Sequence, residues 1–494
     1  MGRAAKLATE MSSRPLYTAA IDLGATSGRV ILGAWSGRRL ALTEVHRFPN
    51  TFRTLGAHDY WELGTLWDEV RRGLAQAAAA LPRGARLASI GVDTWGVDHV
   101  LLNDAGRLVF PVHAYRDART QAGLEHLAKT RAPLERIYAA TGIPNVFYNT
   151  SLQLAETVAS CPAVADLAAR CLFLPDYFNY LLSDRMENEI SIASTSQLLD
   201  VHGPGWSRAT LDHFHIPPHW FTPPILAGTR LGRLGRRARG GLGGPAFDRA
   251  EVVAVPGHDT ACAYDAMPAA PDGSDLYLSS GTWSLVGCES ATPLLGAGAL
   301  DARIANERIG DGRYRPLQNV IGLWLLEGIM KDFSARPRGN REWAALIAAA
   351  AKLPPPAALL DVADPAFANP PSMRAAIDAQ LKRRRLAGPK TLAAYTRLIC
   401  ASLGRGHAAA KEAFERMTGR TFQRILMVGG GSKNSLLCQA TADAAGIPVV
   451  SFTLEGTAVG NIASQLIALR AVPDRAAFRR HLGADLKQKI YEPR

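Results

Sequence analysis

Apolar runs of strand length alternate with helix-length segments along the chain. Buried strands are predicted at residues 87–92, 172–174 and 251–255, and helices at residues 63–81 and 397–418. Strands that alternate with helices predict an α/β fold. A chain of 494 residues exceeds what one hydrophobic core supports, so we expect two to four domains.

A small polar turn interrupts the first apolar run. Residues 20–30 read AIDLGATSGRV and lead into a second β-rich segment, which predicts a hairpin. The two glycines stand four residues apart and no lysine follows, so neither the P-loop nor the dinucleotide-binding pattern fits. Two interpretations stay open: a plain hairpin turn, or a cradle in which backbone N–H groups approach a phosphate.

Two later turns favour the phosphate-binding interpretation of the first one. Residues 275–287, DLYLSSGTWSLVG, repeat strand, small polar turn and strand about half a chain later. Residues 425–434, ILMVGGGSKN, lead from a strand through three glycines toward a helix at 436–445; they suit a phosphate or flat ring, or a tight crossover. Two similar hairpins this far apart predict two domains of similar build, each contributing one turn to a nucleotide site in the cleft between them.

Candidate acid–base residues follow two of the predicted strands. Asp259, in PGHDTA, could accept a proton from a hydroxyl that attacks a γ-phosphate, or it could cap a helix at residues 260–266. His258 beside it suits a structural or a functional role. Asp22, in the first hairpin, could hold a magnesium ion through water, or it could serve only as a turn former.

A further polar segment, GVDTWGVD, ends the strand predicted at residues 87–92. Its indole, Trp95, could cover the apolar face of a sugar. The carboxylates of Asp93 and Asp98 could accept hydrogen bonds from sugar hydroxyls. This segment is therefore a candidate sugar site.

Charge and composition narrow the class of protein. The net charge is +12, but the basic clusters at residues 230–239 and 382–385 are short and lack interleaved aromatic residues, which favours surface charge over nucleic-acid binding. The six cysteines form no C-x-x-C pair, as expected of reduced thiols. We find no export signal and no apolar run of about 18 residues, so we expect a cytoplasmic protein that binds no membrane.

The order of the motifs resembles that of the FGGY family of carbohydrate kinases, which belongs to the actin and hexokinase-like superfamily. The strings DLGATSGR, GVDTWGVD, PGHDTA, SSGTWS and VGGGSKN carry the resemblance, which extends from about residue 17 to about residue 470. It implies two ribonuclease-H-like domains, at residues 15–255 and 256–475, with the active site in the cleft between them. The implied protein is a monomer or homodimer that binds a small ketose and ATP with Mg²⁺, and no nucleic acid.

The resemblance also implies a reaction and its alternatives. It is closest to the branch of the family that phosphorylates L-rhamnulose at the C1 hydroxyl; L-fuculose, D-xylulose and D-ribulose are the alternative ketoses. A repressor or a chaperone of the same superfamily is an alternative of another class. About sixteen residues precede the first hairpin and about 60 follow the third turn, too few for a helix-turn-helix or a peptide-binding domain.

Residue roles follow from the resemblance, position by position. Asp259 is the proton acceptor, and Asp22 would hold the metal through water. Glu327 departs from the pattern, because the branch favours glutamine there, and residues 334–390 match no functional part. The implied sugar-binding residues are Gly96, His258, Asp259, Thr260 and Asn319. The implied ATP-binding residues are Ala25, Thr26, Ser27, Gly28, Arg29, Thr282, Glu327, Gly429, Gly430 and Gly431.

Overall fold

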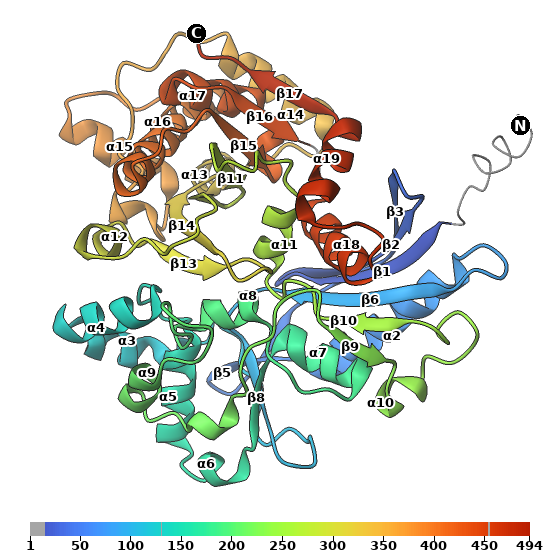
Figure 1. The fold of residues 1–494 in the computed structure, drawn as a ribbon. Helices are drawn as coiled ribbons and strands as arrows, with labels where there is room; N and C mark the ends of the chain where they lie inside the picture. The colour runs from blue at the N-terminus through green and yellow to red at the C-terminus, as the bar shows by residue number, and fades with distance from the viewer. Residues whose placement is uncertain (1–14, 130, 453–454) are drawn as a thin grey trace, which may run out of the picture.

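The structure, a computed structural model, describes residues 15–129, 131–452 and 455–494. In this part of the chain the N-terminal lobe is built around a six-stranded sheet with the order β3-β2-β1-β6-β10-β9 (Figure 1). Long buried runs such as residues 19–23 form its centre. Its strands are β1 (Leu16–Leu23), β2 (Ser27–Trp35), β3 (Leu40–Pro49), β6 (Leu87–Thr94), β9 (Arg230–Arg233) and β10 (Glu251–Val253).

The C-terminal lobe contains a seven-stranded sheet with the order β13-β14-β12-β11-β15-β16-β17. Two small sheets pair β4 (Phe52–Leu55) with β5 (His58–Trp61) and β7 (His99–Leu102) with β8 (Arg170–Phe173). The strands of the large sheet are β11 (Asp275–Ser280), β12 (Trp283–Gly287), β13 (Ala305–Arg308), β14 (Tyr314–Ile321), β15 (Arg424–Val428), β16 (Val449–Phe452) and β17 (Gln488–Tyr491).

The two large sheets repeat one topology. In each, the first strand, β1 or β11, pairs antiparallel with the second strand of its hairpin and parallel with the strand that follows a helix, β6 or β15. The parallel strands end at the same edge, beside the hairpin turn. This repeat confirms the prediction of two α/β domains of ribonuclease-H-like build; the boundary between residues 255 and 256 stays a prediction.

Helices cover the sheets, and two of them lie between the lobes: α11 and α18 (Figure 1). Although α18 comes late in the chain, its Ile462 packs with Ala20, Ile31 and Trp35 of the N-terminal sheet. The helices are α2 (Leu63–Ala79), α3 (Gln121–Ala128), α4 (Arg131–Thr141), α5 (Thr150–Ser160), α6 (Val164–Leu167), α7 (Leu174–Ser183), α8 (Ile190–Ala193), α9 (Arg208–His213), α10 (Arg236–Arg239), α11 (Asp259–Ala266), α12 (Ala297–Asp301), α13 (Trp324–Asp332), α14 (Asn340–Ala351), α15 (Met373–Arg383), α16 (Leu392–Thr418), α17 (Ser435–Ala445), α18 (Gly456–Ala468) and α19 (Arg475–Asp485).

Two segments for which the sequence predicts no functional role form regular structure: residues 334–390 and residues 230–239. Residues 334–390 include α14 and α15, which share a hydrophobic core with α13 and α16. The basic cluster at residues 230–239 forms the edge strand β9 and helix α10, where Arg237 pairs with Asp184. None of the helices in the described residues is long and apolar enough to cross a membrane.

Candidate active site

Three acidic residues meet where parallel strands of the N-terminal sheet end. Asp22 is the last but one residue of β1 and lies beside Asp93 of β6 in the strand register. The segment that follows β10 continues this edge, because Thr94 forms a bridge with His258, directly before Asp259. The carboxyl edge of a parallel sheet is a common ligand site, and here it brings the predicted metal-binding and proton-accepting residues together.

Negative charge at this edge is only partly compensated. Burial raises the pKa of Asp22 to about 6, although Arg29 donates a hydrogen bond to it at 2.5 Å. Burial and the neighbouring Asp22 raise the pKa of Asp93 well above its usual range. Asn461 donates to Oδ2 of Asp93 at 2.6 Å, whereas Oδ1 has no partner among the described residues. Such a cluster favours a cation or a proton.

Asp259 is the first residue of α11, and its side chain does not cap the helix. The N-cap is His258, and no side chain makes a capping hydrogen bond there. Oδ1 of Asp259 accepts a hydrogen bond from the Thr260 hydroxyl at 3.0 Å, and the side chain is 31% exposed. The capping alternative is therefore wrong, and the carboxylate is accessible for proton transfer.

The predicted sugar residues Gly96 and His258 are neighbours in the structure. A β-carbon at Gly96 would lie 3.4 Å from Nε2 of His258 and from Thr195. The next residue, Val97, has a φ of 70°, a left-handed conformation that strains a β-branched side chain. Hydrogen bonds hold this turn: the Thr150 hydroxyl donates to the Val97 carbonyl at 2.6 Å, and the Val97 amide donates to Thr195 at 3.1 Å.

The Trp95–Asp98 turn differs from the prediction. Asp98 is fully buried and accepts hydrogen bonds from the indoles of Trp61, at 2.6 Å, and Trp95, at 2.8 Å. Trp95 itself is 5% exposed and packs against Trp61. Both side chains therefore hold the turn in place, and the interpretation that they contact sugar directly is wrong for this conformation.

Glu189 is a site residue that the sequence reasoning missed. Its buried carboxylate accepts from the backbone amide of Gly257, two residues before Asp259, at 2.9 Å, and from the amide and hydroxyl of Ser191. Burial raises the pKa of Glu189 to about 7. Nothing in the local pattern around residue 189 points to the segment at 256–259, because the two meet only through the fold.

The first predicted phosphate turn is held by side chains of neighbouring segments. Asn50, also missed, donates to the Gly24 carbonyl at 2.8 Å. A β-carbon at Gly28 would lie 2.2 Å from the ring of Phe48, so packing requires glycine there. Arg29 forms ion pairs with Asp22 and with Glu455, which directly precedes α18. The cation predicted to bind phosphate is thus already held by two carboxylates.

The second and third turns pack against each other. β-Carbons at Gly429 and Gly431 would lie 2.6 Å and 2.1 Å from atoms of Ser280, whereas one at Gly430 would meet no atom within 4 Å. Of the three glycines, Gly430 thus leaves the most space for a ligand. The Thr282 carbonyl accepts from the amide of Trp324, at 3.1 Å, where α13 begins.

The remaining predicted residues lie near these turns. Exposed Glu327 is in the first turn of α13, and exposed Asn319 is on β14 opposite Leu285 of β12. The neighbouring residues Ala25, Thr26 and Ser27 form the first turn, of which Thr26 is exposed. The structure therefore forms all three turns, and it puts Gly96, His258, Asp259 and Thr260 in one place.

The chain is similar to known proteins along nearly its whole length. Two family models match it: "FGGY family of carbohydrate kinases, N-terminal domain" at residues 17–264, and the C-terminal domain of the same family at residues 276–469. A rhamnulokinase of Klebsiella pneumoniae subsp. pneumoniae is 38% identical, with 97% of this chain and 94% of that protein covered. A rhamnulokinase of Yersinia pestis is 36% identical, with 93% and 92% covered.

Solved structures show the same fold at low identity. A gluconate kinase from Lactobacillus acidophilus superposes with a TM-score of 0.77 at 12% identity, with 97% of this chain and 94% of that chain covered. A xylulose kinase from Rhodospirillum rubrum gives 0.74 at 19% identity, with the same shares covered. At such identities the likeness concerns the fold alone.

Proposed function

We propose that this chain, which belongs to the FGGY family of carbohydrate kinases, transfers the γ-phosphoryl group of ATP to the C1 hydroxyl of L-rhamnulose. The products would be L-rhamnulose 1-phosphate and ADP, in the breakdown of L-rhamnose. The choice of ketose is supported by the rhamnulokinases at 36–38% identity. The main support for this reaction is the carboxylate of Asp259. It makes no helix-capping hydrogen bond, is partly exposed and lies at the same strand edge as Asp22.

Asp259 would accept the proton of the attacking hydroxyl. Phosphoryl transfer has a loose transition state, so the base mainly holds the hydroxyl in line and takes the proton late. A carboxylate suffices for this role. His258, Gly96, Thr260 and Asn319 would hold the ketose. The closeness of His258, Gly96 and Thr260 to Asp259 supports their assignment, whereas the assignment of Asn319 rests on the family resemblance.

The three small-residue turns would bind ATP. Thr26 is exposed and Gly430 has open space beside it, so phosphates or the nucleoside can approach both turns, and Arg29 would exchange a carboxylate partner for phosphate. The first turn contributes Ala25, Thr26, Ser27, Gly28 and Arg29, and the C-terminal lobe contributes Thr282, Glu327, Gly429, Gly430 and Gly431.

The acidic edge suits a magnesium ion held largely through water, because the described residues contain no cluster of three or more His, Cys, Asp or Glu side chains placed to hold a metal ion directly. Its donors are hard carboxylate oxygens, and one buried oxygen of Asp93 has no partner in the described part of the chain. Asp22 would hold Mg²⁺ through water. The ion, when bound, neutralises charge on the nucleotide phosphates.

An ADP-release assay with purified protein tests the substrate. L-Rhamnulose, L-fuculose, D-xylulose and D-ribulose are compared at equal concentrations, and Asp259→Asn serves as the inactive control. We expect L-rhamnulose to give the highest kcat/KM. A higher value for another ketose would reject L-rhamnulose as the substrate but leave the kinase activity in place. No ADP release with any sugar would reject both the substrate and the kinase activity.

We further propose that the protein acts in the cytoplasm as a monomer or homodimer and binds neither nucleic acid nor membrane. Arginines of the basic segment are partly ion-paired, as in the Arg230–Glu251 bridge, which supports surface charge over a nucleic-acid site. Light scattering after size-exclusion chromatography measures the oligomeric state. A filter-binding assay at low salt tests whether the protein binds nucleic acid.

A further inference from the structure

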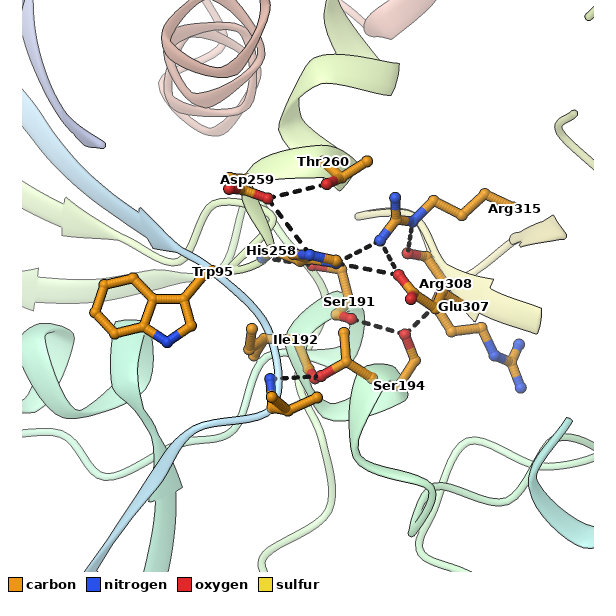
Figure 2. A network of polar contacts seen from close by, with 12 residues as sticks. Trp95, Ser191, Ile192, Ser194, His258, Asp259, Thr260, Glu307, Arg308 and Arg315 are labelled. Carbon is orange, nitrogen blue, oxygen red and sulfur yellow. Dashed lines mark hydrogen bonds and ion pairs between the residues drawn. The ribbon is translucent and has the colours of Figure 1, made fainter. Parts of the chain in front are cut away.

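A buried ion pair of the C-terminal sheet reaches the candidate active site. Glu307 of β13 and Arg315 of β14 are cross-strand partners, and their side chains form an ion pair next to His258 (Figure 2). The Arg315 side chain is fully buried, and that of Glu307 is 13% exposed. The pair belongs to one lobe, whereas His258 follows the last parallel strand of the other.

The imidazole of His258 lies between this ion pair and Asp259. Nδ1 of His258 is 3.1 Å from Oε2 of Glu307 and 2.5 Å from Nη2 of Arg315. On the other side of the ring, Nε2 is 3.4 Å from Oδ1 of Asp259. The two ring nitrogens thus have fixed and different neighbours, and the orientation of the ring depends on the charged pair.

The pair is held in turn by its own strand neighbours. Nε of Arg315 donates to the Arg308 carbonyl at 3.2 Å, and the Arg308 amide donates to the Ser194 hydroxyl at 2.8 Å (Figure 2). Burial acts to raise the pKa of Glu307, but the charges of Arg315 and His258 lower it to about 2. Glu307 is therefore an anion at any pH at which the enzyme would work.

We propose that Glu307 is a positioning residue: with Arg315 it fixes the His258 ring so that Nε2 faces Asp259 and the bound ketose. This rests on the proposed function, in which Asp259 takes the proton and His258 holds the sugar. A side chain that must be aligned with a reacting hydroxyl supports the reaction less well when it is displaced by about an ångström or less. Glu307 touches no reacting atom and acts only through His258.

Glu307→Gln tests the proposal, because glutamine keeps the shape and removes the charge. We expect kcat/KM for the ketose to fall roughly 10- to 100-fold, with KM for ATP unchanged. Glu289→Gln is the matched control: Glu289 is also a buried anion of this lobe, bonded to Arg479 at 2.6 Å, and it has no contact with His258 in the structure's described residues. The control should keep the wild-type kcat/KM.

A double-mutant cycle separates positioning from a general loss of structure. If Glu307 acts through His258, Glu307→Gln should have no further effect in a His258→Gln background, whereas independent losses would multiply. Multiplied losses, or a normal kcat/KM in Glu307→Gln while the wild type is active, would overturn the inference. A wild type that phosphorylates no ketose would instead overturn the proposed function.

A second variant covers the case in which Glu307→Gln fails to fold because Arg315 is left as an unpaired buried charge. Glu307→Gln/Arg315→Gln removes both charges and leaves none unpaired. The same loss in kcat/KM for the ketose is expected in this variant, with a thermal midpoint near that of the wild type. A folded double variant with normal ketose kinetics would reject the role of the pair.

Discussion

Carboxylates lie in opposite electrostatic surroundings near the two ends of helix α11, where Glu289 of the segment after β12 approaches the C-terminal end through Arg479. At the N-terminal end, Asp259 shares its edge with Asp22 and Asp93, and burial together with mutual repulsion raises the pKa values of the latter two. At the C-terminal end, Glu289 is bonded to Arg479 at 2.6 Å and to Arg313 at 2.8 Å. There the arginine charges outweigh burial and lower the pKa of Glu289 to about 2.

The C-terminal cluster also holds the helix itself. Arg479 donates to the backbone carbonyl of Tyr264 at 2.7 Å, and Arg475 donates to Asp265 at 2.6 Å, although burial still leaves the pKa of Asp265 raised. Cations at a helix C-terminus stabilise it. The comparison indicates that matched charges anchor α11 at one end, while unmatched negative charge at the other end is available for a metal ion or a proton.

The largest expected effect is at the N-terminal end. Asp259→Asn keeps size and hydrogen-bonding reach but cannot take the proton, so kcat should fall roughly 10²- to 10⁴-fold with KM changed little. Steady-state kinetics with both substrates measure this. Retention of more than about a tenth of kcat would mean that the base lies elsewhere.

The matching change at the C-terminal end should affect stability instead. Glu289→Gln leaves buried arginines without their anion, so we expect a loss of about 3 kcal/mol in the free energy of unfolding. Urea unfolding measures this loss, and kcat is measured below the unfolding transition. A tenfold drop in kcat with unchanged stability would contradict the division of roles between the two ends.

The pH dependence of stability should have opposite signs at the two ends. The pKa of Glu289 is lower in the folded state, so its contribution is present above about pH 4.5 and is lost as the pH falls toward about 2. The pKa of Asp22 is raised to about 6 in the folded state, so its contribution is present below about pH 4 and is lost as the pH rises through 6.

Asp22→Asn isolates the second of these effects. In the wild type, Asp22 should make the free energy of unfolding fall by on the order of 1–2 kcal/mol between pH 4 and pH 6. The variant should lack this fall. Urea unfolding of wild type and variant at half-unit pH steps gives the difference. An unchanged slope between the two pH values would show that Asp22 titrates normally in the folded protein.

The smallest expected effect concerns the ion pair between Arg29 and Glu455. Glu455 is 59% exposed, so the pair contributes little, and Glu455→Gln should lower KM for ATP by no more than about fivefold by releasing Arg29 for phosphate. Kinetics with varied ATP at saturating ketose measure it. An increase in KM would indicate that Glu455 helps to bind the nucleotide.

The sequence by itself determined the local elements and the chemistry they carry. The apolar runs on both sides of the first turn, the small residues of the two hairpins and the three glycines at 429–431 correctly predicted strand–turn–strand and strand–turn–helix units. The order of these motifs also identified the family, which the matching models confirm. Local periodicity and turn chemistry act over a few residues, so a single sequence displays them directly.

Only the tertiary structure decided which distant residues meet. Glu307 and Arg315 reach His258, Glu189 binds the amide of Gly257, and α18 packs on the N-terminal sheet, none of which has a local signal. Asp98 looked like a sugar ligand in the sequence but is fully buried under two indoles. Such contacts depend on strand order and on how the two lobes pack, and a carboxylate's role depends on the cations that packing brings to it.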